Sequence, residues 1–330
     1  MQRSYTRFGS KFYACILIIT VCLGSRVLPF RSSDAYDRDV IECDAPYDES
    51  CCSNSNPCSK KIASIRLALE RVPSNSTLTL TLGETFSYLR AGGSLARFGD
   101  GEVKALGGRD VRYERTSTEL KRALSFVASL GGNPHLSPCL CVGTYPILDR
   151  NFSRIRPGKR REFAKNLYKT YISIWNEHMH PGLYCDSFVS RPDGVDDLQY
   201  DAVEYFTPQW QSVFEGQKVL LVRGGLPSKP STLDKTVFSR HLKHAESVSE
   251  LKSFKSARLH KTVYLSQVST DSFEEYVGIR NAVLQSLARD KYDVVVLSLG
   301  LTASILAAEL SCRGFRAVDV GQFGGNFSKP

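Results

Sequence analysis

The feature that most constrains the fold is the apolar run Asp293-Val-Val-Val-Leu-Ser-Leu299. A strand with apolar residues at nearly every position is covered on both faces, as the strands of parallel sheets are. Gly300-Leu301-Thr302 then leads the chain into a predicted helix over 303–312, and a last strand is predicted over 317–320. Strand, helix and strand in this order form a βαβ unit with parallel strands. The sequence therefore predicts an α/β protein.

Shorter segments of the same kind precede this unit, with short apolar runs that predict strands and apolar residues at helical spacing that predict helices. The predicted strands cover 94–98, 140–142, 218–222 and 262–265. The predicted helices cover 61–72, 81–91, 118–130, 158–178, 233–242 and 273–288. We therefore expect the domain over 78–330 to be a doubly wound, Rossmann-like, mostly parallel sheet flanked by helices, with ligands at the carboxyl ends of the strands.

The N-terminal segment has the character of a targeting signal. Arg3, Arg7 and Lys11 precede an apolar run over 12–25. This run is short for a membrane span and normal for the core of a signal peptide. The basic residues favour a cytosolic N-terminus, so that the rest of the chain enters the secretory lumen. We favour an uncleaved type II signal anchor at 1–33, in the Golgi or ER membrane, over a cleaved signal that would give a secreted protein.

The polar segment that follows, 34–77, is the predicted lumenal stem. It contains Cys43, Cys51, Cys52 and Cys58 and little apolar material. We predict that these cysteines form disulfides, because a segment without a core of its own needs another means of ordering itself. A zinc site is the weaker alternative, since two of the cysteines are adjacent and no histidine lies nearby.

The rest of the chain carries features that agree with a lumenal protein. Three triplets are potential glycosylation sites, at Asn75, Asn151 and Asn326. Four cysteines in apolar surroundings are predicted to be buried thiols or to form one further bridge, namely Cys139, Cys141, Cys185 and Cys312. The net charge of +9 is modest for 330 residues and is spread along the chain, so we expect no nucleic-acid partner.

The candidate site follows the strand predicted over 94–98. Gly99-Asp100-Gly101-Glu102 predicts a tight loop, in which the two glycines let Asp100 and Glu102 converge on one point. A carboxylate pair of this kind suits Mg²⁺ or Mn²⁺, which bind carboxylate oxygens and keep waters or substrate phosphates as other ligands. Arg97 adds the positive charge that a phosphate-bearing substrate attracts. The alternative is a surface Asp-Gly turn without chemistry.

Two other positions could bind ligands. Thr302 lies at the entry of a predicted helix, where its hydroxyl and backbone N–H groups can meet a phosphate. His178 and His180 form an H-x-H pair that could hold a metal ion, but we favour the interpretation that they are surface polar residues at the end of a helix.

Four segments together resemble a known family. Ser94-Leu-Ala-Arg-Phe-Gly-Asp-Gly-Glu102, Ser187-Phe-Val-Ser-Arg-Pro192, Leu297-Ser-Leu-Gly-Leu-Thr-Ala-Ser304 and Gly314-Phe-Arg-Ala-Val-Asp-Val-Gly321 are similar to motifs of the GT-D glycosyltransferases, the former DUF1792 domain. The resemblance implies a GT-D fold and the metal-dependent transfer of a sugar from a nucleotide sugar, typically UDP-glucose. It also implies that Asp100 and Glu102 are the catalytic Asp-x-Glu motif and hold Mn²⁺ or Mg²⁺.

The predicted function is transfer of a sugar from a UDP-sugar to a glycan or glycoprotein in the secretory pathway. The residues expected to bind the donor are Arg97, Gly99, Arg191, Gly300, Thr302 and Asp319. For Arg191, a structural salt bridge is an equal alternative. The chain departs from the family pattern at Leu301, where the family has Pro, and at Gln322, where it has His. These departures keep a second hypothesis open, a lumenal carbohydrate- or nucleotide-sugar-binding protein without catalysis.

Overall fold

The computed structural model describes residues 77–111, 115–131, 139–144, 159–190, 202–224, 258–265, 273 and 276–321. All of them belong to one unit of the chain, 42–330. Several predictions lie outside the described residues: the anchor, the four cysteines of the stem, the three glycosylation triplets, Arg191, and the helices over 61–72 and 233–242. Within the described ranges, no helix has both the length and the apolar character that a membrane span requires.

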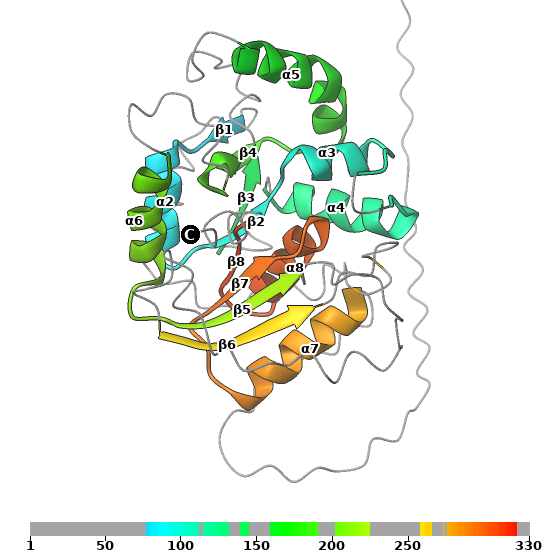
Figure 1. Cartoon of the computed structure of the whole chain (residues 1–330). Helices are drawn as coiled ribbons and strands as arrows, with labels where there is room; N and C mark the ends of the chain where they lie inside the picture. The colour runs from blue at the N-terminus through cyan, green and yellow to red at the C-terminus, as the bar shows by residue number, and fades with distance from the viewer. Residues whose placement is uncertain are drawn as a thin grey trace, which may run out of the picture. The chain divides into compact units, whose positions relative to one another are not determined.

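Among the residues that the structure describes, eight parallel strands form the centre of the domain, in the order β1-β4-β3-β2-β8-β7-β5-β6 (Figure 1). The strands are β1 (Thr77–Thr79), β2 (Ser94–Arg97), β3 (Leu140–Thr144), β4 (Gly182–Asp186), β5 (Lys218–Gly224), β6 (Arg258–Leu265), β7 (Val294–Ser298) and β8 (Ala317–Asp319). The predicted parallel α/β sheet is confirmed, whereas the strands β1 and β4 were not predicted from the sequence.

Helices cover both faces of this sheet. They are α2 (Leu82–Arg90), α3 (Asp100–Leu106), α4 (Thr118–Gly131), α5 (Lys159–His178), α6 (Ala202–Phe214), α7 (Tyr276–Arg289) and α8 (Leu301–Cys312), with a short 3₁₀ helix η4 (Ser187–Ser190). One cluster of buried side chains joins the sheet to α3, α4, α5, α7 and α8, and a second joins it to α2 and α6. Val294 and Val296 belong to the second cluster, and Val295 and Leu297 to the first. This explains the unbroken apolar run of β7.

The helix boundaries follow from local capping. Thr81 precedes α2 and forms a capping box with Glu84, in which the Glu84 backbone N–H donates to Thr81 Oγ1 and the Thr81 N–H donates to Glu84 Oε2. Before α4, Ser117 Oγ accepts a hydrogen bond of 3.1 Å from the Leu120 N–H. The predicted starts of these two helices are confirmed.

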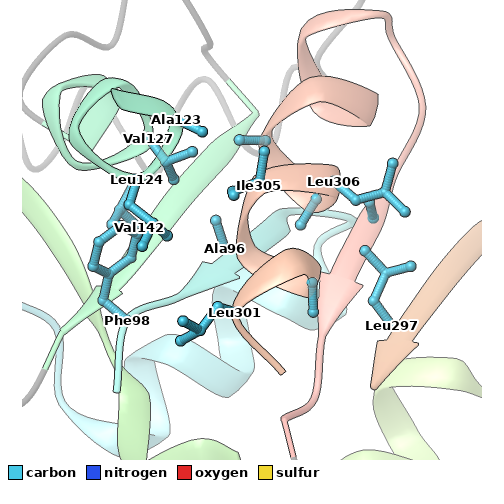
Figure 2. Packing of buried hydrophobic residues seen from close by; sticks show 14 of the residues in the cluster. Ala96, Phe98, Ala123, Leu124, Val127, Val142, Leu297, Leu301, Ile305 and Leu306 are labelled. Carbon is cyan, nitrogen blue, oxygen red and sulfur yellow. The ribbon is translucent and has the colours of Figure 1, made fainter. Parts of the chain in front are cut away.

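The first cluster fixes α8 against β2. Figure 2 shows side chains of β2, α4 and α8 gathered in one layer, among them Ala96, Leu124 and Ile305. Phe98 is fully buried in the same cluster and Leu301 is 4% exposed. Burying a large apolar side chain stabilises a domain by about 1.5–3 kcal/mol. The N-terminal end of α8 is thereby packed beside the segment that follows β2.

Disulfides add covalent links to the sheet. Cys141 in β3 and Cys185 in β4 are bonded to each other, with their Cα atoms 5.8 Å apart and 44 residues between them in sequence. Cys139 and Cys312 each take part in a disulfide bond too. Of the two interpretations kept for these four cysteines, the one that leaves all of them as thiols is therefore wrong.

The strand order changes direction between β2 and β8. From β2 the chain continues to β3 and then β4 on one side, whereas β8 has β7, β5 and β6 on the other side. In doubly wound sheets, ligands bind outside the carboxyl ends of the strands at this switch point. The candidate site is therefore expected where β2, β7 and β8 end.

Candidate active site

Strand ends at the switch point bring three of the sequence segments together. β2 ends at Arg97 and is followed by Gly99, the N-cap of α3. β7 ends at Ser298, and Gly300 is the N-cap of α8. β8 ends at Asp319. The 3₁₀ helix η4 contributes a fourth segment, because Arg97 Nε donates to the carbonyl oxygen of its first residue, Ser187, at 3.4 Å.

The predicted loop over 99–102 is wrong, because these residues begin a helix. Gly99 caps α3, and the Gly99 N–H donates to Glu102 Oε2 at 2.7 Å. Glu102 is 4% exposed. Asp100 is partly exposed and pairs with Lys104 at 3.3 Å one turn further on. Residues two positions apart on a helix do not face each other, so the expected convergence of Asp100 and Glu102 on one point is not found.

Ser304 joins the buried parts of the site and was not singled out as a site residue in the sequence. Its hydroxyl lies 3.5 Å from Glu102 Oε1 and 3.0 Å from Asp319 Oδ2, and it also bonds the carbonyl oxygen of Arg97. A hydroxyl group has a single proton to donate, yet three oxygen acceptors surround this one. Ser304 therefore connects α8 to the ends of β2 and β8 and to the first turn of α3.

Two buried carboxyl groups face the same arginine. Burial raises the pKa of Glu102 above its usual value, and the Arg97 guanidinium opposes that shift. Burial also raises the pKa of Asp319, to about 7, again against the effect of Arg97. Asp319 Oδ1 accepts a further hydrogen bond of 2.8 Å from the Gly321 N–H. These carboxyls are thus held by the fold and carry less charge than exposed carboxylates would.

Arg97 is the buried cation of the site. Arg97 is 8% exposed. Within the part of the chain that the structure describes, Nε is the only side-chain nitrogen of Arg97 that forms a hydrogen bond. A Cβ atom at Gly99 would lie 2.9 Å from Nη2, and one at Gly321 would lie 2.7 Å from Nη1. The guanidinium therefore lies against two backbone segments without side chains, and its fork of N–H groups can bind an anion.

The start of α8 offers a second group of donors beside this arginine. The helix begins at Leu301, two residues earlier than predicted, so that Thr302 lies in its first turn. The first backbone N–H groups of a helix have no partner within the helix and attract anions. Thr302 Oγ1 is buried and has no hydrogen-bond partner among the described residues. An oxyanion ligand near Gly300 would satisfy these donors.

The two predicted metal ligands, Asp100 and Glu102, differ in how well they fit a metal site. Within the described ranges, no group of three or more His, Cys, Asp and Glu side chains is arranged to hold a metal ion. Asp100 fits a site completed by substrate oxygens, because its carboxylate reaches the surface. Glu102 does not fit in this conformation, since its oxygens already serve the α3 cap and Ser304.

His178 is not the exposed residue that the sequence suggested. It is the last residue of α5, its side chain is 10% exposed, and Nδ1 lies 3.0 Å from Ser125 Oγ. Burial lowers its pKa. His178 therefore holds α5 against α4. This is a structural role and not the metal binding considered for His178 and His180.

The fold and the site together define a class of protein. It is a doubly wound α/β domain with a buried arginine and a helix N-terminus at its switch point, an arrangement that suits phosphate-bearing ligands. A family model described as "Glycosyltransferase GT-D fold" matches residues 95–239. This match contains the Asp-x-Glu segment and η4, and it confirms the resemblance to GT-D glycosyltransferases.

Known proteins agree with this assignment. The chain is 25% identical over 268 residues to the probable glycosyl transferase Gly of Streptococcus gordonii and 25% identical over 243 residues to the glycosyltransferase GlyD of Streptococcus pneumoniae serotype 4. These matches cover 78% and 73% of this chain but only 33% and 26% of the relatives. The solved DUF1792 glycosyltransferase of Streptococcus sanguinis superposes with a TM-score of 0.59 at 20% identity, covering 76% of this chain and 84% of that one. The described domain therefore has the GT-D fold.

Proposed function

We propose that this protein is a glycosyltransferase that moves a sugar from a UDP-sugar to a glycan or glycoprotein acceptor. The observation that carries the proposal is Arg97, a buried guanidinium whose terminal nitrogens have no hydrogen bond among the described residues, at the switch point of a GT-D fold. The names of the streptococcal relatives support the reaction class.

The chemistry follows from the charge on the leaving group. When the bond between the sugar and UDP breaks, negative charge grows on the diphosphate, and positive groups fixed beside it lower the barrier. Arg97 would donate two N–H groups to that diphosphate, and Thr302 with the first N–H groups of α8 would add neutral donors. Gly99 and Gly300 would let the backbone approach the ligand closely. Asp319 would hold the frame rather than touch the donor.

A divalent ion is part of the proposal. Mn²⁺ or Mg²⁺, when bound, supplies further positive charge to the diphosphate. Asp100 would hold it, because its carboxylate lies at the surface at the start of α3, whereas Glu102 would support the loop-to-helix junction from inside. Mg²⁺ commonly binds one or two carboxylates together with substrate phosphates, so a single protein carboxylate is compatible with this arrangement.

The proposed location is the secretory lumen, with an N-terminal type II anchor in the Golgi or ER membrane. The disulfide between Cys141 and Cys185 supports this location, because such bonds persist in oxidising compartments. A buried disulfide between two adjacent strands agrees with folding in the lumen.

The alternative is a protein that binds nucleotide sugars without turnover. The buried position of Glu102 favours this alternative, because one carboxylate of the Asp-x-Glu pair is then withdrawn from the metal. A binding protein would retain affinity for UDP through Arg97 and Thr302 and release no nucleotide.

One experiment separates the two functions. The full chain is incubated with a panel of nucleotide sugars, with and without Mn²⁺, and nucleotide release is measured together with UDP binding. Release from a UDP-sugar that requires the metal supports the transferase. Binding without release supports the alternative, and the absence of both contradicts the proposed donor site.

A further inference from the structure

Gly321 forms a turn that the sheet fixes from two sides. It follows β8, is buried, and has a φ angle of +54°. Its N–H donates to Asp319 Oδ1 at 2.8 Å, and its carbonyl oxygen accepts a hydrogen bond of 2.6 Å from Ser298 Oγ at the end of β7. The backbone at this point therefore has little freedom to move.

The same turn lies directly against the Arg97 side chain. A Cβ atom added at Gly321 would be 2.7 Å from Nη1, 3.3 Å from Cζ and 3.4 Å from Cδ of Arg97. Contacts below 3.0 Å require one partner to shift, and here the backbone is the fixed partner. Gly99 borders the guanidinium at Nη2 in the same way. Any side chain at Gly321 would displace the guanidinium.

We infer that Gly321 is a positioning residue for Arg97. Its missing side chain provides the space in which the guanidinium lies, with Nε bonded to Ser187 and with Nη1 and Nη2 available to an anion. The inference rests on the proposed function for the identity of that anion, the diphosphate of a UDP-sugar. Gly321 itself makes no contact with the ligand and acts through Arg97.

The chain offers a matched control for the test. Gly216, in the turn after α6, has a φ angle of +67°, and a Cβ added there would meet nothing within 4 Å. Gly321→Ala and Gly216→Ala therefore both place a side chain in the left-handed region, but only the first displaces Arg97. With full-length protein and the UDP-sugar that the wild type uses, we expect Gly321→Ala to raise KM for the donor about tenfold and to lower kcat as well, because Arg97 both binds the diphosphate and stabilises the charge that grows on it.

Gly216→Ala should leave both constants at the wild-type values, and its melting temperature should fall less than that of Gly321→Ala, which also displaces a buried guanidinium. Equal KM values in the two variants would overturn the inference while leaving the proposed function intact. If the wild type binds UDP without turnover, the dissociation constant of UDP takes the place of KM, and the transferase proposal alone fails. A wild type that neither binds UDP nor releases nucleotide contradicts both.

A double variant shows whether Gly321 acts through Arg97. In an Arg97→Gln background, Gly321→Ala should change donor KM by less than about twofold, because the group that it displaces is already absent. A tenfold effect in that background would contradict the positioning role. If Gly321→Ala does not fold, Ser298→Ala tests the same turn, since it removes one of the two fixing hydrogen bonds and should raise KM about threefold.

Discussion

Replacing Glu102 by alanine should destabilise the domain, whereas replacing Asp100 by alanine should not. The Glu102 carboxylate accepts the Gly99 N–H at 2.7 Å in a buried setting, so its removal leaves a buried donor without a partner. Such a loss costs about 1–3 kcal/mol. The Asp100 pair with Lys104 is about one third exposed at both side chains. Pairs of that kind contribute about 0.3–0.5 kcal/mol.

These magnitudes can be read directly as melting temperatures. A change of 1 kcal/mol shifts the melting temperature by about 2–4 °C for a domain of roughly this size. We therefore expect Glu102→Ala to lower it by about 4–8 °C, taking a cost near 2 kcal/mol. Asp100→Ala should shift it by less than about 2 °C. Differential scanning calorimetry of the full chain measures both.

Glu102→Gln separates the hydrogen bond from the charge. The amide oxygen of glutamine can accept the Gly99 N–H, and burial already raises the pKa of Glu102, so loss of the charge is tolerated. This variant should melt within about 3 °C of the wild type. Equal, small shifts for Glu102→Ala and Asp100→Ala would refute the reasoning, because they would mean that Glu102 points to solvent like an ordinary turn residue.

Three further changes test other parts of the site and frame. Asp319→Asn should stabilise the protein at pH 8 relative to the wild type and have little effect at pH 4, as melting curves at both pH values would show. The folded pKa of Asp319, near 7, lies above the unfolded value, although Arg97 opposes this rise, so the wild type loses stability as pH rises between about 4 and 7. Ser304→Ala should cost about 1–3 kcal/mol in urea unfolding, because the buried oxygens around it lose their donor. Cys141→Ala with Cys185→Ala should cost about 2–5 kcal/mol in the same assay, whereas an unchanged midpoint in a reducing agent would argue against the bond.

The sheet was predictable because its strands are apolar on both faces. In β7, Val294 and Val296 face one layer of helices while Val295 and Leu297 face the other. Burial on both faces requires apolar residues at successive positions, which the sequence shows as an unbroken apolar run. The missed elements lack such a signal. β1 has only three residues, and α6 contains Pro208, which has no N–H to donate and usually ends a helix. Packing of Trp210 and its neighbours overrides that local preference.

The wrong loop at the start of α3 has a similar cause. Gly99 and Gly101 are turn residues by propensity, and the helix is only seven residues long. Its stability comes from the cap that Glu102 makes and from burial of Val103 and Leu106 against α4 and its neighbours. Neither contribution can be read from a four-residue pattern.

Ser304 shows why the centre of the site could not be derived from the sequence. It lies 207 residues from Arg97, 202 from Glu102 and 15 from Asp319 in the chain, yet its hydroxyl reaches all three. Only the strand order, which sets β8 beside β2, brings these segments together. The consequence is a division of roles within the Asp-x-Glu motif. The helix directs Asp100 to the surface and turns Glu102 inward, where it shares Ser304 with Asp319. In the proposed function, the position of Asp100 depends on a junction that Glu102 holds, so loss of activity in a Glu102 variant is informative only when its stability is measured as well.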